Sequence, residues 1–204
     1  DTTQGLYERG VVSQGDKFVW KDCSANKEIA EIANSKHLPD AYITELCPAA
    51  VGLINSLAGA LKSGAILMID YGFPAREYYH PQRNQGTLMC HYQHLAHTDP
   101  LIYVGLQDIT AHVDFTAIAE AGVGNGLQLE GFCSQAQFLM NCGILDVMSQ
   151  VSPHDIAQYA PLAAAAQKLL SPAEMGDLFK VIGFSKNMDI ALMGFSSGDK
   201  SHTL

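Results

Sequence analysis

The pattern of apolar and polar residues along this chain is most informative in the segment that begins at Gly64. It runs Gly-Ala-Ile-Leu-Met-Ile-Asp-Tyr-Gly, an apolar stretch far too short to span a membrane, and it stops at an acid, an aromatic residue and a glycine. This pattern predicts a buried strand that ends at a site, because ligands of open α/β sheets bind beyond the carboxyl ends of strands. Asp70 and Tyr71 are therefore the first candidates for functional residues.

The residues before this strand predict a hairpin and two helices. Residues 6–22 carry β-forming side chains on both sides of the turn sequence 13–16, which favours a hairpin. Residues 26–34 show a short amphipathic helical pattern. In residues 42–61 leucines and alanines recur at spacings of three and four, so we expect a helix with Pro48 in its first turn.

The segment between His80 and His112 has a different character. It contains five of the eight histidines of the chain, and neither helical nor strand periodicity persists in it. A long irregular segment that is rich in polar side chains is more often functional than accidental. We therefore expect a functional loop here.

Caps and short apolar runs define the elements of the last third of the chain. The expected helices are 115–121 with Asp114 as its cap and Gly122 at its end, 134–141, and two that start at 152–155 and 171–174. The expected strands are 127–133, 179–184 and 190–195, the last two forming an antiparallel pair at a sheet edge. No linker divides the chain, so the pattern predicts one α/β domain spanning residues 1–204.

Composition and charge disfavour some classes of protein function. The chain has 204 residues, of which 48% are hydrophobic, and 21 acids against 12 bases give a net charge of −9. Such a balance disfavours nucleic acid as a partner, since neutralising phosphates supplies most of that affinity. The five cysteines include no C-x-x-C pair, which indicates a reducing compartment and no zinc ribbon. With neither a signal-peptide pattern nor a membrane-spanning run, we expect a cytoplasmic protein without membrane insertion.

Two groups of residues in the histidine-rich segment suggest chemistry. His91, His94 and His97 are spaced by three, but this spacing matches no recognised metal site, and loop histidines that form hydrogen bonds are the preferred interpretation, so no metal is predicted. Asp108 and Asp114 could act as a general base and a substrate-orienting acid around His112. Helix capping remains the favoured role for Asp114. For Asp108, hydrogen bonding to the backbone of a turn and a catalytic role are equally open.

Several motifs together resemble those of a known family. They are Leu-Met-Ile-Asp-Tyr-Gly (67–72), Tyr-Tyr-His-Pro-Gln-Arg (78–83), Gln-Gly-Thr-Leu (85–88) and Asp-Ile-Thr-Ala-His-Val-Asp-Phe (108–115). Shorter matches at 45–50, 134–139 and 171–175 extend the likeness over nearly the whole chain. The combination resembles the MidA family of S-adenosylmethionine-dependent methyltransferases. Mitochondrial members of that family are complex I assembly factors that methylate an arginine on a partner subunit.

The resemblance implies the C-terminal part of a Rossmann-like class I methyltransferase sheet with added helices. In that fold a glycine-rich turn after the first strand and an acid after the second hold the cofactor, and this sequence shows neither. We therefore expect an incomplete methyltransferase domain in residues 1–204, which lacks the N-terminal cofactor-binding half and leaves a sheet edge exposed. S-adenosylmethionine is the implied cofactor, and its binding residues are not predicted.

The resemblance also suggests roles for particular residues. Asp70 and Asp108 would contact a substrate guanidinium while His94 helps to remove its proton. Tyr71 and Tyr92 would form the walls of the pocket, and the further substrate-binding candidates are Thr110, His112 and Asp114. The implied partner is a protein, such as a subunit of a respiratory complex. The alternative is a non-catalytic assembly module that recognises a protein partner; the sequence predicts no oligomeric state.

Overall fold

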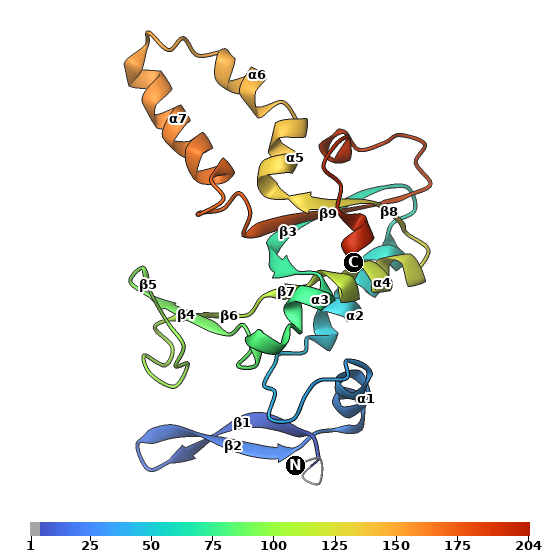
Figure 1. Cartoon of the computed structure of the whole chain (residues 1–204), viewed down its shortest axis with the longest axis vertical. Helices are drawn as coiled ribbons and strands as arrows, with labels where there is room; N and C mark the ends of the chain where they lie inside the picture. The colour runs from blue at the N-terminus through green and yellow to red at the C-terminus, as the bar shows by residue number, and fades with distance from the viewer. Residues whose placement is uncertain (1–4) are drawn as a thin grey trace. The chain divides into compact units, whose positions relative to one another are not determined.

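The computed structural model describes residues 5–204, which form two compact units (Figure 1). Unit 1 comprises the described residues up to Cys47 together with Tyr79–His112. Unit 2 comprises Pro48–Tyr78 and Val113–Leu204.

Unit 1 begins with the predicted hairpin. Strands β1 (Tyr7–Gln14) and β2 (Lys17–Ser24) pair antiparallel over their full length, and Gly15 in the turn has a φ of 62°. Helix α1 (Lys27–Ser35) follows, and the Asn26 side chain caps it by accepting a hydrogen bond from the Ile29 amide at 2.9 Å. The predictions of a hairpin and a short amphipathic helix are confirmed.

The predicted irregular loop contains a small antiparallel sheet, so that prediction was wrong in part. Strands β4 (Met89–Tyr92), β5 (Leu95–His97) and β6 (Asp108–Thr110) form it in the order β5-β4-β6. Gln93 and His94 both have positive φ, which makes the two-residue turn that joins β4 to β5. Strands of three and four residues are too short to show a periodic pattern in the sequence. A 3₁₀ turn at Pro81–Arg83 precedes them.

Unit 2 is built on a four-stranded sheet in the order β7-β3-β9-β8. Strand β3 (Gly64–Phe73) is the predicted strand, but the prediction that it is buried was wrong, since Leu67 and Ile69 are both about half exposed. Strand β7 (Val113–Asp114) pairs in parallel with its last two residues. Strand β9 (Phe179–Lys186) runs antiparallel between β3 and β8 (Gln128–Ser134). The strands β7, β3 and β8 therefore all point the same way.

The expected antiparallel pair at the C-terminus is not present. Residues 190–195 form no strand; Met193–Phe195 is a 3₁₀ turn, and β9 lies inside the sheet rather than at its edge. The physical reason is Phe195, whose ring covers two glycines of the sheet, Gly131 and Gly183. A Cβ atom at Gly183 would lie 2.3 Å from this ring. The apolar residues of this segment therefore pack onto the sheet face instead of extending it.

One face of the sheet is covered by α2 (Pro48–Ala60) and α4 (Phe115–Gly124). Pro48 is the first helical residue of α2 and Asp114 caps α4, as the sequence predicts. Gly122 does not end α4, however, because it lies inside the helix where the Phe184 ring packs against it. The core between these layers consists of Ile54, Ala58, Phe115, Ile118, Ala119, Leu127, Phe132, Ile182 and Phe184.

The other face is covered by α5 and the C-terminal turn. Helix α5 (Gln135–Asn141) is capped by Ser134 as predicted, and Cys133, Val181 and Phe195 form a second buried cluster with Phe138 packed against it. Figure 1 shows α5, α6 (Ile144–Ser149) and α7 (Ile156–Leu170) on the opposite side of β8 and β9 from α2 and α4. Short helices at Ala75–Tyr78 (α3) and Ser201–Thr203 complete unit 2.

The helix expected to start at 171–174 was also a wrong prediction. Residues 172–178 form turns that lead from α7 into β9. The Gly176 amide donates a hydrogen bond to the Ser171 carbonyl at 2.8 Å, and a Cβ atom at Gly176 would lie 2.2 Å from the Leu170 carbonyl oxygen. This close approach folds the chain back before a helix can form. Within residues 5–204, no helix has the length and apolar character needed to cross a bilayer.

Candidate functional site

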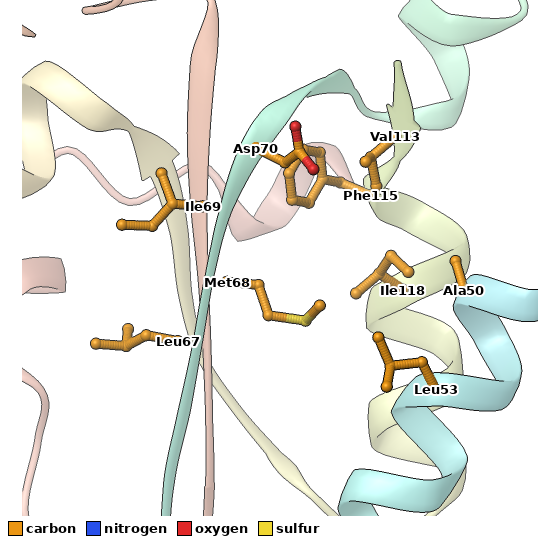
Figure 2. A pocket seen from close by; sticks show the side chains of 9 residues that line it. All are labelled: Ala50, Leu53, Leu67, Met68, Ile69, Asp70, Val113, Phe115 and Ile118. Atoms are coloured by element: carbon orange, nitrogen blue, oxygen red, sulfur yellow. The ribbon is translucent and has the colours of Figure 1, made fainter. Parts of the chain in front are cut away.

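Asp70 and Tyr71 lie within the last four residues of β3, which continues to Phe73 instead of stopping at Asp70, and they point to opposite faces of the sheet, as adjacent residues of a strand do. Asp70 Oδ1 accepts a hydrogen bond from the Tyr71 amide at 2.8 Å, and its side chain points toward the side of α2 and α4 (Figure 2). The Tyr71 ring packs edge-on against Phe179, with 5.0 Å between ring centroids. The two candidates therefore do not converge on one site within unit 2.

A cavity of about 340 Å³ lies beside Asp70. Figure 2 shows Met68 and Asp70 pointing from β3 toward α2 and α4, whereas Leu67 and Ile69 point away. The Asp70 carboxylate is the one charged group among the lining side chains. They are Ala50, Leu53, Leu67, Met68, Ile69, Asp70, Val113, Phe115 and Ile118.

Lys180 lies opposite Asp70 in the register of β3 and β9, so the two side chains leave the same face of the sheet. Burial lowers the pKa of this lysine, while the charges of Asp177 and Glu77 oppose that shift. Its ammonium donates a hydrogen bond to the Asp177 carbonyl. Sequence spacing does not reveal this lysine, because only the pairing of β9 with β3 places it opposite Asp70.

The small sheet of unit 1 brings other candidates together. Asp108 lies opposite His91 and Thr110 lies opposite Met89, so Asp108, Thr110 and His91 share one face. His94 lies in the turn between β4 and β5 rather than opposite Asp108. His91 is therefore a candidate partner for Asp108, a pairing that sequence spacing did not indicate.

Tyr92 belongs to an aromatic cluster on the other face of that sheet. Its ring stacks on Tyr103 with 4.5 Å between centroids, and His97 meets the edge of Tyr103 at 5.8 Å. Both ring nitrogens of His97 are buried without a hydrogen-bond partner among the described residues. Across residues 5–204 no group of three histidine, cysteine or acidic side chains is placed to hold a metal ion.

Glu45 forms a hydrogen-bonded centre in unit 1 that sequence spacing could not reveal. Its carboxylate accepts hydrogen bonds from the Thr87 amide at 2.9 Å, the Thr87 hydroxyl at 3.0 Å and the Leu88 amide at 3.1 Å. The buried Thr87 hydroxyl also accepts from the His112 amide at 2.9 Å. Glycine is required at position 86, since a Cβ atom there would lie 2.2 Å from Glu45 Oε1.

His112 and Asp114 thus have observed structural contacts. The His112 backbone is tied to Thr87, and Asp114 Oδ1 accepts from the Ala117 amide at 3.2 Å as the cap of α4. The candidates divide between the units. Unit 2 contains Asp70, Tyr71 and Asp114, and unit 1 contains Tyr92, His94, Asp108, Thr110 and His112. Their proposed roles in binding and catalysis stay predictions.

Two solved structures resemble this fold closely, and both are proteins of Burkholderia thailandensis. One, described as a "likely methyl transferase" bound to S-adenosyl-homocysteine, is 52% identical with a TM-score of 0.92. The other, a native crystal structure, is 51% identical with a TM-score of 0.92. The alignments cover 99% of this chain but only 53% and 55% of those chains, so this chain spans about half of their length.

The mixed α/β sheet and these structures agree with a Rossmann-like class I methyltransferase fold, and the predicted fold class is confirmed. Residues 1–133 match the model of a family described as "Putative S-adenosyl-L-methionine-dependent methyltransferase". The chain belongs to that family. Among curated proteins none matches this chain.

Proposed function

We propose that this chain is the substrate-side part of a protein that transfers a methyl group from S-adenosylmethionine to an arginine of a protein partner. The observation that carries the methyltransferase assignment is the family match over residues 1–133, and the similarity to a protein solved with S-adenosyl-homocysteine supports it. The choice of arginine rests on the acidic candidates Asp70 and Asp108 and on the resemblance to MidA. That resemblance also makes a respiratory-complex subunit the candidate partner.

The described residues do not fit the cofactor by themselves. S-adenosylmethionine carries a sulfonium, an ammonium, a carboxylate and a nucleoside, and ligands of this kind are held by several convergent polar groups. The cavity beside Asp70 offers one carboxylate among apolar side chains. We infer that cofactor binding by the whole protein requires polypeptide beyond residues 1–204.

The residues of this chain would act on the substrate. A guanidinium is planar, cationic and protonated at neutral pH, so carboxylates must orient it and a base must help to remove its proton. Asp108 is exposed on β6, and no hydrogen bond to its carboxylate is found in the described part of the chain. His91, opposite it, and His94, in the adjoining turn, are the proposed proton carriers.

The test uses this chain and a version extended to the natural ends of the protein. Calorimetric titration of S-adenosylmethionine should show binding by the extended protein and none by residues 1–204. With labelled S-adenosylmethionine and a lysate from cells lacking the gene, the label should appear on arginine. Label on another residue type would contradict the arginine assignment, and binding by neither protein would contradict the methyltransferase assignment.

Replacing one acid tests the site. Asp108→Asn in the extended protein should lower methyl transfer about a hundredfold, because a positioned acid–base group contributes roughly 10²–10⁴-fold. Asp189→Asn, a matched change at an exposed acid, should leave the rate unchanged. Equal rates for both variants would remove Asp108 from the site.

A second candidate function is favoured by one feature of unit 1. Large apolar side chains are exposed on and beside its small sheet, among them Leu95 at 73% and Leu106 at 69%. Exposed apolar groups gathered in one region mark interaction surfaces. A non-catalytic module that recognises a protein partner is therefore the alternative, and failure of both proteins to bind S-adenosylmethionine would favour it.

A further inference from the structure

One face of the small sheet in unit 1 carries large apolar side chains. Cys90 lies opposite His97 of β5 and opposite Ile109 of β6. Tyr92 lies opposite Leu95, so these five side chains all leave the same face of the sheet. Cys90 is fully buried, whereas Leu95 and Ile109 are exposed. The part of this face that meets solvent is therefore apolar.

The loop that joins β5 to β6 extends the apolar surface. Its Tyr103 stacks on Tyr92, which places the loop against the same face of the sheet. Tyr103 is itself about half exposed, and the other large apolar side chains exposed in the loop are Ile102, Val104 and Leu106. We call the sheet face and this loop together the apolar face of unit 1. Exposed apolar groups gathered in this way mark interaction surfaces.

Hydrogen bonds hold the loop in one conformation. The Gln107 side chain donates to the Pro100 carbonyl at 2.9 Å and also to the Ile102 carbonyl. The Leu106 amide donates to the Tyr103 carbonyl at 2.8 Å. Tyr103 has a φ of 50°, a costly conformation for a bulky residue, and such strain is concentrated at binding and catalytic sites. A loop ordered in advance loses little conformational entropy when a partner binds.

The charges around the apolar face are negative. No lysine or arginine occurs between Arg83 and Lys168, whereas Asp99 and Asp108, both exposed, lie at the two ends of the loop. Burial raises the pKa of the Cys90 thiol, and the charges of these two acids raise it further, so both act on the middle strand. A second copy of the chain would bring the same acids together, but a basic partner would complement them.

We propose that the apolar face of unit 1 docks a protein segment in which arginine and lysine stand beside large apolar side chains. The loop supplies the apolar contact, and Asp99 and Asp108 supply the opposite charge. Arginine fits both features, because its guanidinium is weakly hydrated and stacks on aromatic rings such as that of Tyr103. That this segment belongs to the methylated protein rests on the proposed function, whereas the docking itself does not.

The test uses the protein extended to its natural ends and a short fluorescent peptide in which arginine and lysine alternate with leucine. Fluorescence anisotropy should show binding at least tenfold tighter than for two matched peptides, one with glutamine in place of the basic residues and one with serine in place of leucine. Equal binding of the three peptides would overturn the proposal. Leu106→Cys in the extended protein should react with a maleimide within tenfold of its rate in the denatured protein. Slower reaction would also overturn the proposal, because the protein itself or a second copy would then cover the face.

Matched variants of the extended protein locate the contact. Leu106→Lys should weaken binding of the basic peptide at least tenfold, whereas Leu145→Lys, at a 55% exposed position of α6, should leave it unchanged. Asp99→Asn removes a charge but keeps the oxygen that accepts from the Leu101 amide at 3.0 Å, and it should weaken binding about threefold. Circular dichroism checks that each variant folds. Equal affinities of the two folded leucine variants would overturn docking at this face, and the comparison of peptides on the unaltered protein needs no substitution.

Methyl transfer separates this inference from the proposed function. With labelled S-adenosylmethionine and a lysate from cells lacking the gene, Leu106→Lys should slow the labelling of arginine. Labelling at the same rate by this variant and the unaltered protein would overturn docking of the methylated segment and leave the proposed function intact. Peptide binding at the apolar face without any arginine labelling would overturn the proposed function and leave the docking intact.

Discussion

At the scale of single residues, Glu45 is the most consequential side chain of unit 1 that sequence reasoning did not assign a role. Its carboxylate accepts from two backbone amides and one hydroxyl. Glu45→Gln turns one acceptor oxygen into a donor facing these groups, so we expect it to lower the free energy of unfolding by about 2 kcal/mol. Chemical denaturation measures this loss, and Glu174→Gln at an exposed position should change stability little. If the two variants were equally stable, the Glu45 contacts would not matter for folding.

Residue contacts also explain why motifs that resemble a family need not be catalytic. Glu45 and the segment Gln85–Leu88 are both parts of the MidA-like pattern, and the structure shows them holding each other in place. Asp114 likewise belongs to a motif and caps a helix. Residue type and spacing could indicate that these positions matter, but not whether they matter for chemistry or for folding, because a carboxylate serves both purposes.

At the scale of elements, the Asp199 carboxylate helps to hold the C-terminal segment to β8. Asp199 Oδ1 accepts from the Phe132 amide at 2.8 Å and from the Ser201 hydroxyl at 2.7 Å. Burial raises the pKa of Asp199, but the hydrogen bonds from Phe132 and Ser201 outweigh it, and the pKa lies below the ordinary value of 3.8 for an aspartate. A lowered pKa means that this stabilisation is present above about pH 4 and is lost as pH falls through the folded-state pKa.

Asp199→Asn should therefore destabilise the protein near neutral pH and cease to do so in acid. We expect a loss of about 1 kcal/mol at pH 7, modest because the residue is exposed, and a difference that shrinks steadily below about pH 4. Denaturation of both proteins at several pH values measures it. A stability difference that stayed constant down to pH 2 would contradict the assigned ionised state.

Elements with strong local signals were predictable, and those set by long-range contacts were not. A turn sequence predicts the hairpin around Gly15, a capping residue predicts the start of helix α4, and an apolar run predicts strand β3. Residues 190–195 have strand-like composition, but Phe195 is drawn onto Gly131 and Gly183, which are distant in sequence. The site is subject to the same limit. Lys180 was missed, and His91 was considered only with His94 and His97, because only the strand register places these two residues opposite Asp70 and Asp108.

At the scale of the whole molecule, the two units differ in how much core they bury. Residues 181–185 of β9 are all buried, and most of the core belongs to unit 2, whereas the buried residues described in unit 1 are Thr87 and Cys90. The hairpin of β1 and β2 is largely exposed, and an isolated two-stranded hairpin is at best marginally stable in water. Local stability should therefore vary strongly along the chain.

Native-state hydrogen exchange should rank the strands in the order of their burial. We expect the amides of β9 to exchange slowest, those of β4 and β6 at intermediate rates, and those of β1 and β2 fastest. Glu45→Gln should then speed exchange in β4 and β6 and leave β9 unchanged, because Glu45 holds Thr87 and Leu88 beside β4 and contributes nothing to the core around β9. If β1 and β2 exchanged as slowly as β9, or if the substitution accelerated all strands equally, the chain would unfold as one cooperative body and the stability difference between the units would be refuted.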